Sequence, residues 1–200
     1  MTVTDENLTP DPSILDSPGE RISDSLLRTL PGDAYYSPDR DAPGKMYTRQ
    51  GAFLAGIDEF DPLFFGMAPR EAIGLDPQQR LLLEVCWEAL EDAAIAPQRL
   101  AGSNAGLFVG LFMDDYAGLA FHSGDAEQID AYTTLGSLRS MAAGRLAYFL
   151  DIHGPAVQLD TACSSSMLAV HEACQSLRSG ACDLALAGGS NLMLTPDATI

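Results

Sequence analysis

The stretch that decides the fold is Gln158-Leu159-Asp160-Thr161-Ala162-Cys163-Ser164-Ser165-Ser166. Residues 156–160 predict a short strand, and a tight turn of small residues follows it. Residues 165–178 predict a helix, because apolar residues recur at helical spacing and Gly180 stands beyond its end. We expect the buried face of this helix to carry Met167, Val170, Cys174 and Leu177. The succession of strand, turn and helix places Cys163 at the elbow, close to the start of the helix.

The neighbouring segments continue this alternation of strands and helices. The apolar runs 106–113 and 183–188 predict strands that are buried on both faces. A helix is predicted from Pro77 onward, with Asp76 as its cap and Gln79 reaching back as in a capping box. A further helix is predicted over 132–149, with Gly144 as its weak point. We therefore expect an α/β fold with a mostly parallel sheet covered by helices.

Composition excludes several classes of function. With 46% hydrophobic and 20% charged residues, the chain suits a packed globular protein rather than a disordered one. Its net charge of −17 argues against binding to nucleic acid or to anionic lipid, since both need a basic surface. The longest apolar run, 106–113, is too short to span a bilayer. We expect a cytoplasmic protein with reduced thiols and no membrane or nucleic-acid partner.

Cys163 is the candidate for chemistry. At the start of a helix, free backbone N–H groups and the positive end of the helix dipole favour a thiolate and can hold a developing oxyanion. The small neighbours Ala162, Ser164 and Ser165 leave room for a substrate carbonyl. Two interpretations stay open on this pattern alone: a nucleophile, or a small core residue like other buried cysteines. A serine nucleophile is disfavoured because no Gly-x-Ser-x-Gly motif surrounds these serines.

The other candidate residues favour structural roles. We expect core thiols at Cys86, Cys174 and Cys182, and the absence of a Cys-x-x-Cys pair argues against a zinc site. The three histidines, His122, His153 and His171, lack a spaced partner and are expected to be structural or solvent-facing. The pair Asp114-Asp115 lacks a third spaced ligand, so we predict a solvated loop there and no metal site.

An ordered series of motifs resembles one family. The segment 160–166 resembles the active-site motif of β-ketoacyl synthase (ketosynthase) domains of modular type I polyketide synthases. The resemblance extends over about residues 33–200 and is carried by further segments at 60–72, 76–84, 87–93, 169–178 and 184–191.

The resemblance implies a thiolase-like fold and an acyltransferase activity. Cys163 would accept an acyl chain as a thioester and condense it with a malonyl-type extender unit, with loss of carbon dioxide. No tightly bound cofactor is implied. The phosphopantetheine thioester would be carried by a partner acyl carrier protein, and the domain would pair as a homodimer.

Two departures from the family pattern shape the expected domain organisation. Residues 1–32 lack the apolar first strand of the family, so we expect a divergent, poorly ordered segment there and a ketosynthase portion over 33–200. The two catalytic histidines of the family lie in its second half, beyond Ile200. The sequence therefore predicts an incomplete N-terminal half of the fold, which by itself is poorly folded or depends on self-association. Full condensation then requires a complementary polypeptide that supplies the histidines, or is absent.

A non-enzymatic alternative stays open. The chain would then be a catalytically silent ketosynthase fragment that acts only as an interaction or dimerisation module. A chain-length-factor homologue is disfavoured, because such proteins typically replace the nucleophilic cysteine, which is present here as Cys163.

Overall fold

The computed structural model of the 200-residue chain describes residues 35–48, 54–121 and 129–200. These residues belong to two compact units. The described part of the first unit is 58–121 and 129–192, and that of the second is 35–48, 54–57 and 193–200. The expectations for residues 1–32 and for His122 fall outside the described residues.

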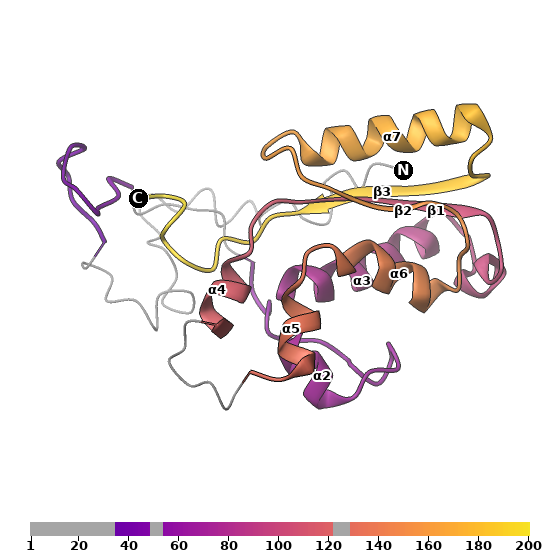
Figure 1. The fold of residues 1–200 in the computed structure, drawn as a ribbon, viewed down its shortest axis with the longest axis horizontal. Helices are drawn as coiled ribbons and strands as arrows, with labels where there is room; N and C mark the ends of the chain where they lie inside the picture. Colours follow the sequence, from indigo (N-terminus) through magenta and orange to yellow (C-terminus); the bar gives the residue numbers. More distant parts are fainter. Residues whose placement is uncertain (1–34, 49–53, 122–128) are drawn as a thin grey trace. The chain divides into compact units, whose positions relative to one another are not determined.

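Among the described residues, the helices and strands all lie in the first unit (Figure 1). In chain order they are α2 (Pro69–Gly74), α3 (Pro77–Asp92), the 3-10 helix η1 (Pro97–Leu100), β1 (Ala105–Leu111), α4 (Asp115–Phe121), α5 (Ala131–Ser137), α6 (Met141–Leu150), β2 (Ala156–Leu159), α7 (Ser165–Ser179) and β3 (Leu184–Ser190). In the second unit, residues 35–48 form turns and one isolated bridge between Tyr36 and Met46, as their turn-rich sequence predicts.

The described strands form one parallel sheet in the order β2-β1-β3. Val109 of β1 lies opposite Gln158 of β2 on one side and Gly188 of β3 on the other. All seven residues of β1 are buried, which confirms the predicted buried strand for 106–111. The last two residues of the predicted run lie beyond β1, and Phe112 is 44% exposed, so the prediction is wrong there. In β3 only Leu186 and Ala187 are buried. The expected two-sided burial of 183–188 is therefore wrong for most of that run: β3 is an edge strand of the described sheet and pairs there with β1 alone.

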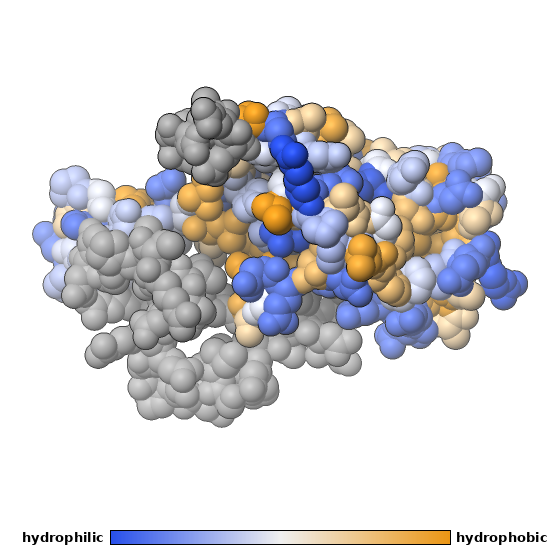
Figure 2. Space-filling model, turned by 90° about the horizontal axis from the view of Figure 1, so that it is seen from below, coloured by the Kyte–Doolittle hydropathy of each residue, from blue (hydrophilic) through white to orange (hydrophobic). Residues whose placement is uncertain are grey.

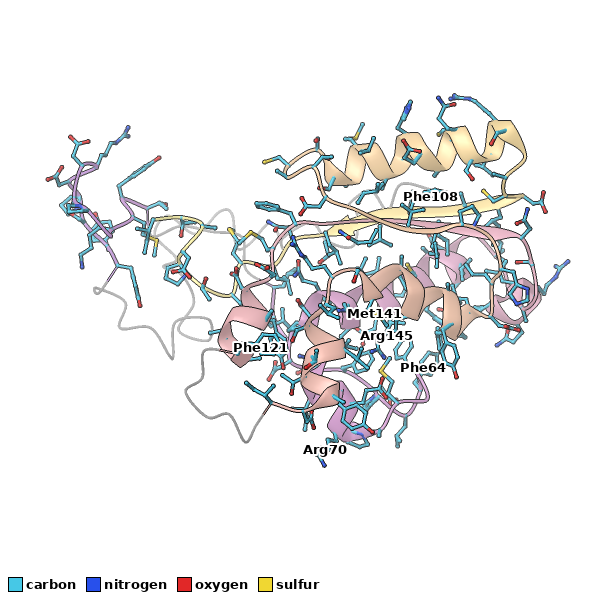
Figure 3. All side chains as sticks on the ribbon, in the orientation of Figure 1. Phe64, Arg70, Phe108, Phe121, Met141 and Arg145 are labelled. Carbon is cyan, nitrogen blue, oxygen red and sulfur yellow. The ribbon has the colours of Figure 1, made fainter. Side chains whose placement is uncertain are left out.

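Helices cover both faces of the sheet, with α7 on one face and α3 and α6 on the other (Figure 1). Phe108 of β1 points toward α7 and packs with Ala169 and Ala173 (Figure 3). The residues that alternate with it, such as Leu107 and Val109, join the larger core cluster on the opposite face. The predicted α/β fold with a helix-covered parallel sheet is confirmed.

The start of α3 follows its local sequence, apart from one side chain. Pro77 is the first helical residue, and the Asp76 carboxylate accepts a hydrogen bond from the Gln78 N–H at 2.8 Å. The predicted reach of Gln79 back to the cap is wrong. Its side-chain amide instead donates to the carbonyls of Gly136 at 2.8 Å and Leu138 at 3.2 Å.

These two hydrogen bonds mark a break that the sequence pattern did not predict. The expected helix over 132–149 is two helices, α5 and α6, separated at residues 138–140. Gly144 lies inside α6, so the predicted weak point is wrong. The carbonyls of Gly136 and Leu138 are held by Gln79 from another helix, and the chain turns there.

The rotation of α7 also differs from the expectation. Its buried residues are Ser165, Ala169 and Ala173, whereas Met167 is 68% exposed and Leu177 is 42% exposed. Small side chains face the sheet because the helix lies close to it. The predicted buried face is therefore wrong for Met167 and Leu177, whereas Val170 packs against the core and Cys174 is half-buried. Among the described residues, no helix is both long enough and apolar enough to cross a membrane.

Candidate active site

The candidate site is the elbow between β2 and α7. The strand ends at Leu159, the helix begins at Ser165, and Cys163 lies between them with an exposed side chain. This arrangement confirms the predicted succession of strand, turn and helix. Ala162, directly before the cysteine, has a φ of 55°. A residue with a Cβ rarely adopts this left-handed conformation, so the surrounding contacts must hold it.

Four hydrogen bonds between side chains and the backbone hold the turn. The Ser165 hydroxyl accepts from the Thr161 N–H at 2.9 Å and donates to the Ala162 carbonyl at 2.7 Å. The Asp160 carboxylate accepts from the Ala162 N–H at 3.1 Å. The Ser164 hydroxyl donates to the Thr161 carbonyl at 2.8 Å. Each bond spans two to four residues, so the segment 160–165 is tied to itself on both sides of Cys163.

The start of α7 lies unusually close to the sheet. A Cβ built on Gly110 of β1 would stand 2.7 Å from the backbone carbon of Ser165 and from the nitrogen of Ser166. A Cβ on Gly189 of β3 would stand 2.9 Å from the Gly110 carbonyl oxygen and 3.0 Å from the Ser166 side chain. Only glycine fits at such an approach, so these two glycines allow the elbow to sit directly over the carboxyl ends of the strands.

This geometry favours thiol chemistry at Cys163. The first N–H groups of a helix have no partner within the helix, and the helix dipole adds positive potential at that end. The exposed Cys163 thiol lies beside this end of α7, where backbone N–H groups can stabilise an oxyanion.

The other three cysteines lie in different surroundings. Cys182 is 2% exposed and packs with Phe108 and Ala173, which confirms the expected core thiol. Cys86 and Cys174 are half-buried. Burial raises the pKa of the Cys86 thiol to about 12. Cys163 is thus the single exposed cysteine of the four, all of which lie in the described residues.

The described histidines are not brought to Cys163 by the local fold. His171 is exposed on α7, eight residues beyond Cys163 and about 12 Å farther along the axis at 1.5 Å per residue. His153 is exposed, and its ring nitrogen Nε2 lies 3.6 Å from Oδ1 of Asp151. Over residues 35–48, 54–121 and 129–200, no three His, Cys, Asp or Glu side chains gather as they would around a metal ion.

Comparison with known proteins decides the family. The family model described as "Beta-ketoacyl synthase, N-terminal domain" matches residues 20–200. The chain belongs to the β-ketoacyl synthase family. The ketosynthase motifs identified in the sequence are therefore family motifs, and the thiolase-like fold that they imply is confirmed for the N-terminal portion.

Curated relatives and solved structures agree with this family. Mycoketide-CoA synthase of Mycobacterium tuberculosis (strain ATCC 25618 / H37Rv) is 52% identical over 162 residues, which are 81% of this chain and 4% of that protein. Polyketide synthase GfsB of Streptomyces halstedii is 51% identical over 168 residues, covering 84% of this chain and 3% of that protein. The oxazolomycin ketosynthase domain OzmH KS7 of Streptomyces albus JA3453 superposes with a TM-score of 0.78 at 37% identity, over 90% of this chain and 31% of that chain. The 200-residue chain therefore spans only a small part of the length of each of these three proteins.

Two features of the ketosynthase elbow carry no signal in the sequence pattern. The first feature is the left-handed φ of Ala162, which the sequence does not predict because alanine rarely adopts this conformation. The second feature is Arg139, whose guanidinium nitrogen Nη1 lies 2.9 Å from Oδ2 of Asp160. The two residues are 21 positions apart, and no local periodicity links them.

Proposed function

We propose that Cys163 is the acyl acceptor of a ketosynthase, an acyltransferase that joins an acyl chain to a malonyl-type extender. The single observation behind this proposal is the exposed Cys163 thiol at the strand-helix elbow of a β-ketoacyl synthase domain. The Cys163 thiolate attacks the carbonyl carbon of an acyl thioester, and the thiol of the donor leaves with a proton. The extender then loses carbon dioxide, and the resulting carbanion attacks the Cys163 acyl carbon. A carbon–carbon bond forms as the Cys163 thiolate is released.

The two half-reactions make different demands on the protein. Formation of the thioester needs a nucleophile and donors for the oxyanion; we propose that Cys163 is the nucleophile and that backbone N–H groups at the start of α7 are the donors. Decarboxylation leaves an enolate, which needs further polarising donors. In the family resemblance those donors are two histidines of the second half, and we propose that a complementary polypeptide provides them. We expect acyl transfer to Cys163 without chain elongation by residues 1–200 alone.

The proposed partners follow from the same chemistry. An acyl carrier protein would deliver both acyl groups on phosphopantetheine, and no tightly bound cofactor is proposed.

A second copy of the chain is the proposed structural partner. Large apolar side chains of α4 and α5 are exposed, among them Leu119, Phe121 and Leu135. Figure 2 shows hydrophobic residues interspersed with hydrophilic ones on the face seen from below. Exposed apolar surface of this kind supports a protein partner, and the cytoplasm is the proposed compartment.

The experiment is acylation of the full chain with a small acyl thioester such as hexanoyl-N-acetylcysteamine, followed by peptide mapping. We expect the acyl group on Cys163 and none after C163A. Cys182 is the internal control, since a buried thiol reacts only if the protein unfolds. Preferential acylation of Cys86, Cys174 or Cys182 in folded protein would contradict the proposal.

The same experiment separates the alternative function, a silent interaction or dimerisation module. That function predicts a Cys163 no more reactive toward the thioester than a cysteine in an unstructured peptide, together with a stable dimer in size-exclusion chromatography. Condensation of acyl and malonyl thioesters by residues 1–200 alone, lost in C163A, would show that the need for added histidines is wrong.

A further inference from the structure

Arg139 lies at a junction of three segments. It stands in the break between α5 and α6, at residues 138–140. Its Nη1 donates to the Phe112 carbonyl, directly after β1, and to Oδ2 of Asp160 at 2.9 Å, directly after β2. Its Nη2 lies 3.9 Å from Oδ2 of Asp114. One side chain therefore connects the carboxyl ends of two adjacent strands.

The Asp160 carboxylate links Arg139 to the elbow, because each of its two oxygens contacts a different partner. While Oδ2 faces Arg139, Oδ1 accepts a hydrogen bond from the Ala162 N–H at 3.1 Å. Ala162 is the residue with a φ of 55° and is bonded directly to Cys163. The chain of contacts thus runs from Arg139 through the Asp160 carboxylate to the left-handed residue that sets the direction of the Cys163 side chain.

We propose that the Arg139–Asp160 ion pair is a positioning device that holds the Cys163 elbow in the conformation needed for acyl transfer. The inference rests on the proposed function, since it concerns the same thiol. Arg139 acts through Asp160 and Ala162, so it is a positioning residue. Acyl transfer requires the thiolate, the carbonyl carbon and the oxyanion donors in one arrangement, whereas alkylation by a small reagent requires only an accessible thiolate.

The expected effect is modest because the pair is partly exposed. The side chains of Arg139 and Asp160 are 32% and 39% exposed, and such pairs contribute little in high dielectric. We expect R139Q to slow acylation of Cys163 about fivefold, the upper end for an exposed ion pair. Alkylation of the same thiol by iodoacetamide should change by less than about twofold, as for ordinary surface substitutions. R139K, which keeps a charge and a donor, should restore most of the acylation rate.

The matched control is a second arginine–aspartate pair. Nη2 of Arg70 lies 2.9 Å from Oδ2 of Asp130, next to α5, and the Arg70 side chain is 77% exposed. R70Q removes the same chemical group as R139Q without touching the elbow contacts. It should leave acylation of Cys163 unchanged.

Hydrogen exchange of the peptide 156–166 provides a readout that does not depend on activity. The N–H groups of Thr161 and Ala162 are hydrogen-bonded to Ser165 and Asp160. We expect their exchange to accelerate about fivefold in R139Q and to stay at the wild-type rate in R139K and R70Q. If wild-type Cys163 takes up no acyl group, the proposed function fails, and the exchange rates alone judge the positioning role.

Two outcomes would overturn the inference. The first is wild-type acylation together with wild-type exchange in R139Q. The second applies if R139Q is unfolded, which iodoacetamide labelling of Cys86 and Cys182 would reveal. In that case D160N replaces R139Q as the deciding variant. D160N removes the ion pair but keeps an oxygen that can accept from Ala162. Acylation of folded D160N at the wild-type rate would then show that the pair does not position Cys163.

Discussion

Replacing Gly110 by alanine tests whether the close approach of α7 to the sheet builds the site. The added Cβ would stand 2.7 Å from backbone atoms of Ser165 and Ser166, and backbone cannot rotate away as a side chain can. Ordinary carbon contacts begin near 3.5 Å, so the start of α7 must move by about 0.8 Å. Overpacking of this kind costs about 1–3 kcal/mol of unfolding free energy.

The same displacement acts on chemistry, because Ser165 both begins α7 and holds the turn around Cys163. A misplacement of about 1 Å can reduce a rate by up to about 100-fold. We therefore expect G110A to lower the acylation rate of Cys163 by more than its loss of stability alone explains. Stability is measured by urea denaturation, with fluorescence from Trp87, the single tryptophan.

G144A is the matched control. A Cβ on Gly144 of α6 would meet no atom within 4 Å, so alanine should stabilise the helix by about 0.5–1 kcal/mol. Acylation of Cys163 should not change in this variant. A G110A protein as stable as wild type, with wild-type acylation, would refute the reasoning that the close approach of α7 positions the thiol.

Three further predictions concern other parts of the first unit. Burial raises the pKa of the Asp76 carboxyl, so its contribution to stability is present below its unfolded pKa and is lost as pH rises through the folded value. D76N keeps a capping oxygen but does not ionise, so its free energy of unfolding should rise relative to that of wild type from pH 4 to 7. Urea denaturation measures both curves, and parallel curves would contradict this. Arg145 Nη1 lies 2.6 Å from Glu71 Oε1, and the two side chains are 15% and 29% exposed. R145M should lose about 2 kcal/mol of unfolding free energy because Glu71 is left without its charged partner, and E71Q/R145M should recover part of that loss. With a pKa of about 12, about one Cys86 thiol in 10,000 is ionised at pH 8. Iodoacetamide should therefore leave Cys86 unmodified from pH 7 to 9, and rapid labelling of Cys86 in folded protein would contradict its burial.

Elements governed by residues close together in the chain could be predicted from the sequence. The apolar run 106–113 predicted a buried strand, and its residues 106–111 lie in β1, where all of them are buried. The start of α3 followed from Asp76 and Pro77, whose effects act within one turn. The position of Cys163 at an elbow followed from a strand, small residues and a helix in direct succession, whereas its exposure came from the structure. These features need no knowledge of distant partners.

Features created by distant partners came only from the tertiary structure. The break at 138–140 coincides with Gln79, which lies 57 residues from the Gly136 carbonyl that it binds. The buried face of α7 is its small residues rather than Met167 and Leu177, because Gly110 and Gly189 let the helix approach the sheet so closely. Hydrophobic periodicity reports which side chains are apolar, and it carries no information on how near a neighbouring element lies.

In the candidate site too, some features follow from the local sequence and others only from the tertiary structure. Cys163 and its neighbours are consecutive, so the sequence by itself could predict a candidate nucleophile and its place directly before a helix. The Arg139 contact and the left-handed Ala162 depend on where the ends of β1 and β2 meet the break between α5 and α6. Packing of separate elements sets those positions, and the tertiary structure alone shows how the thiol is held.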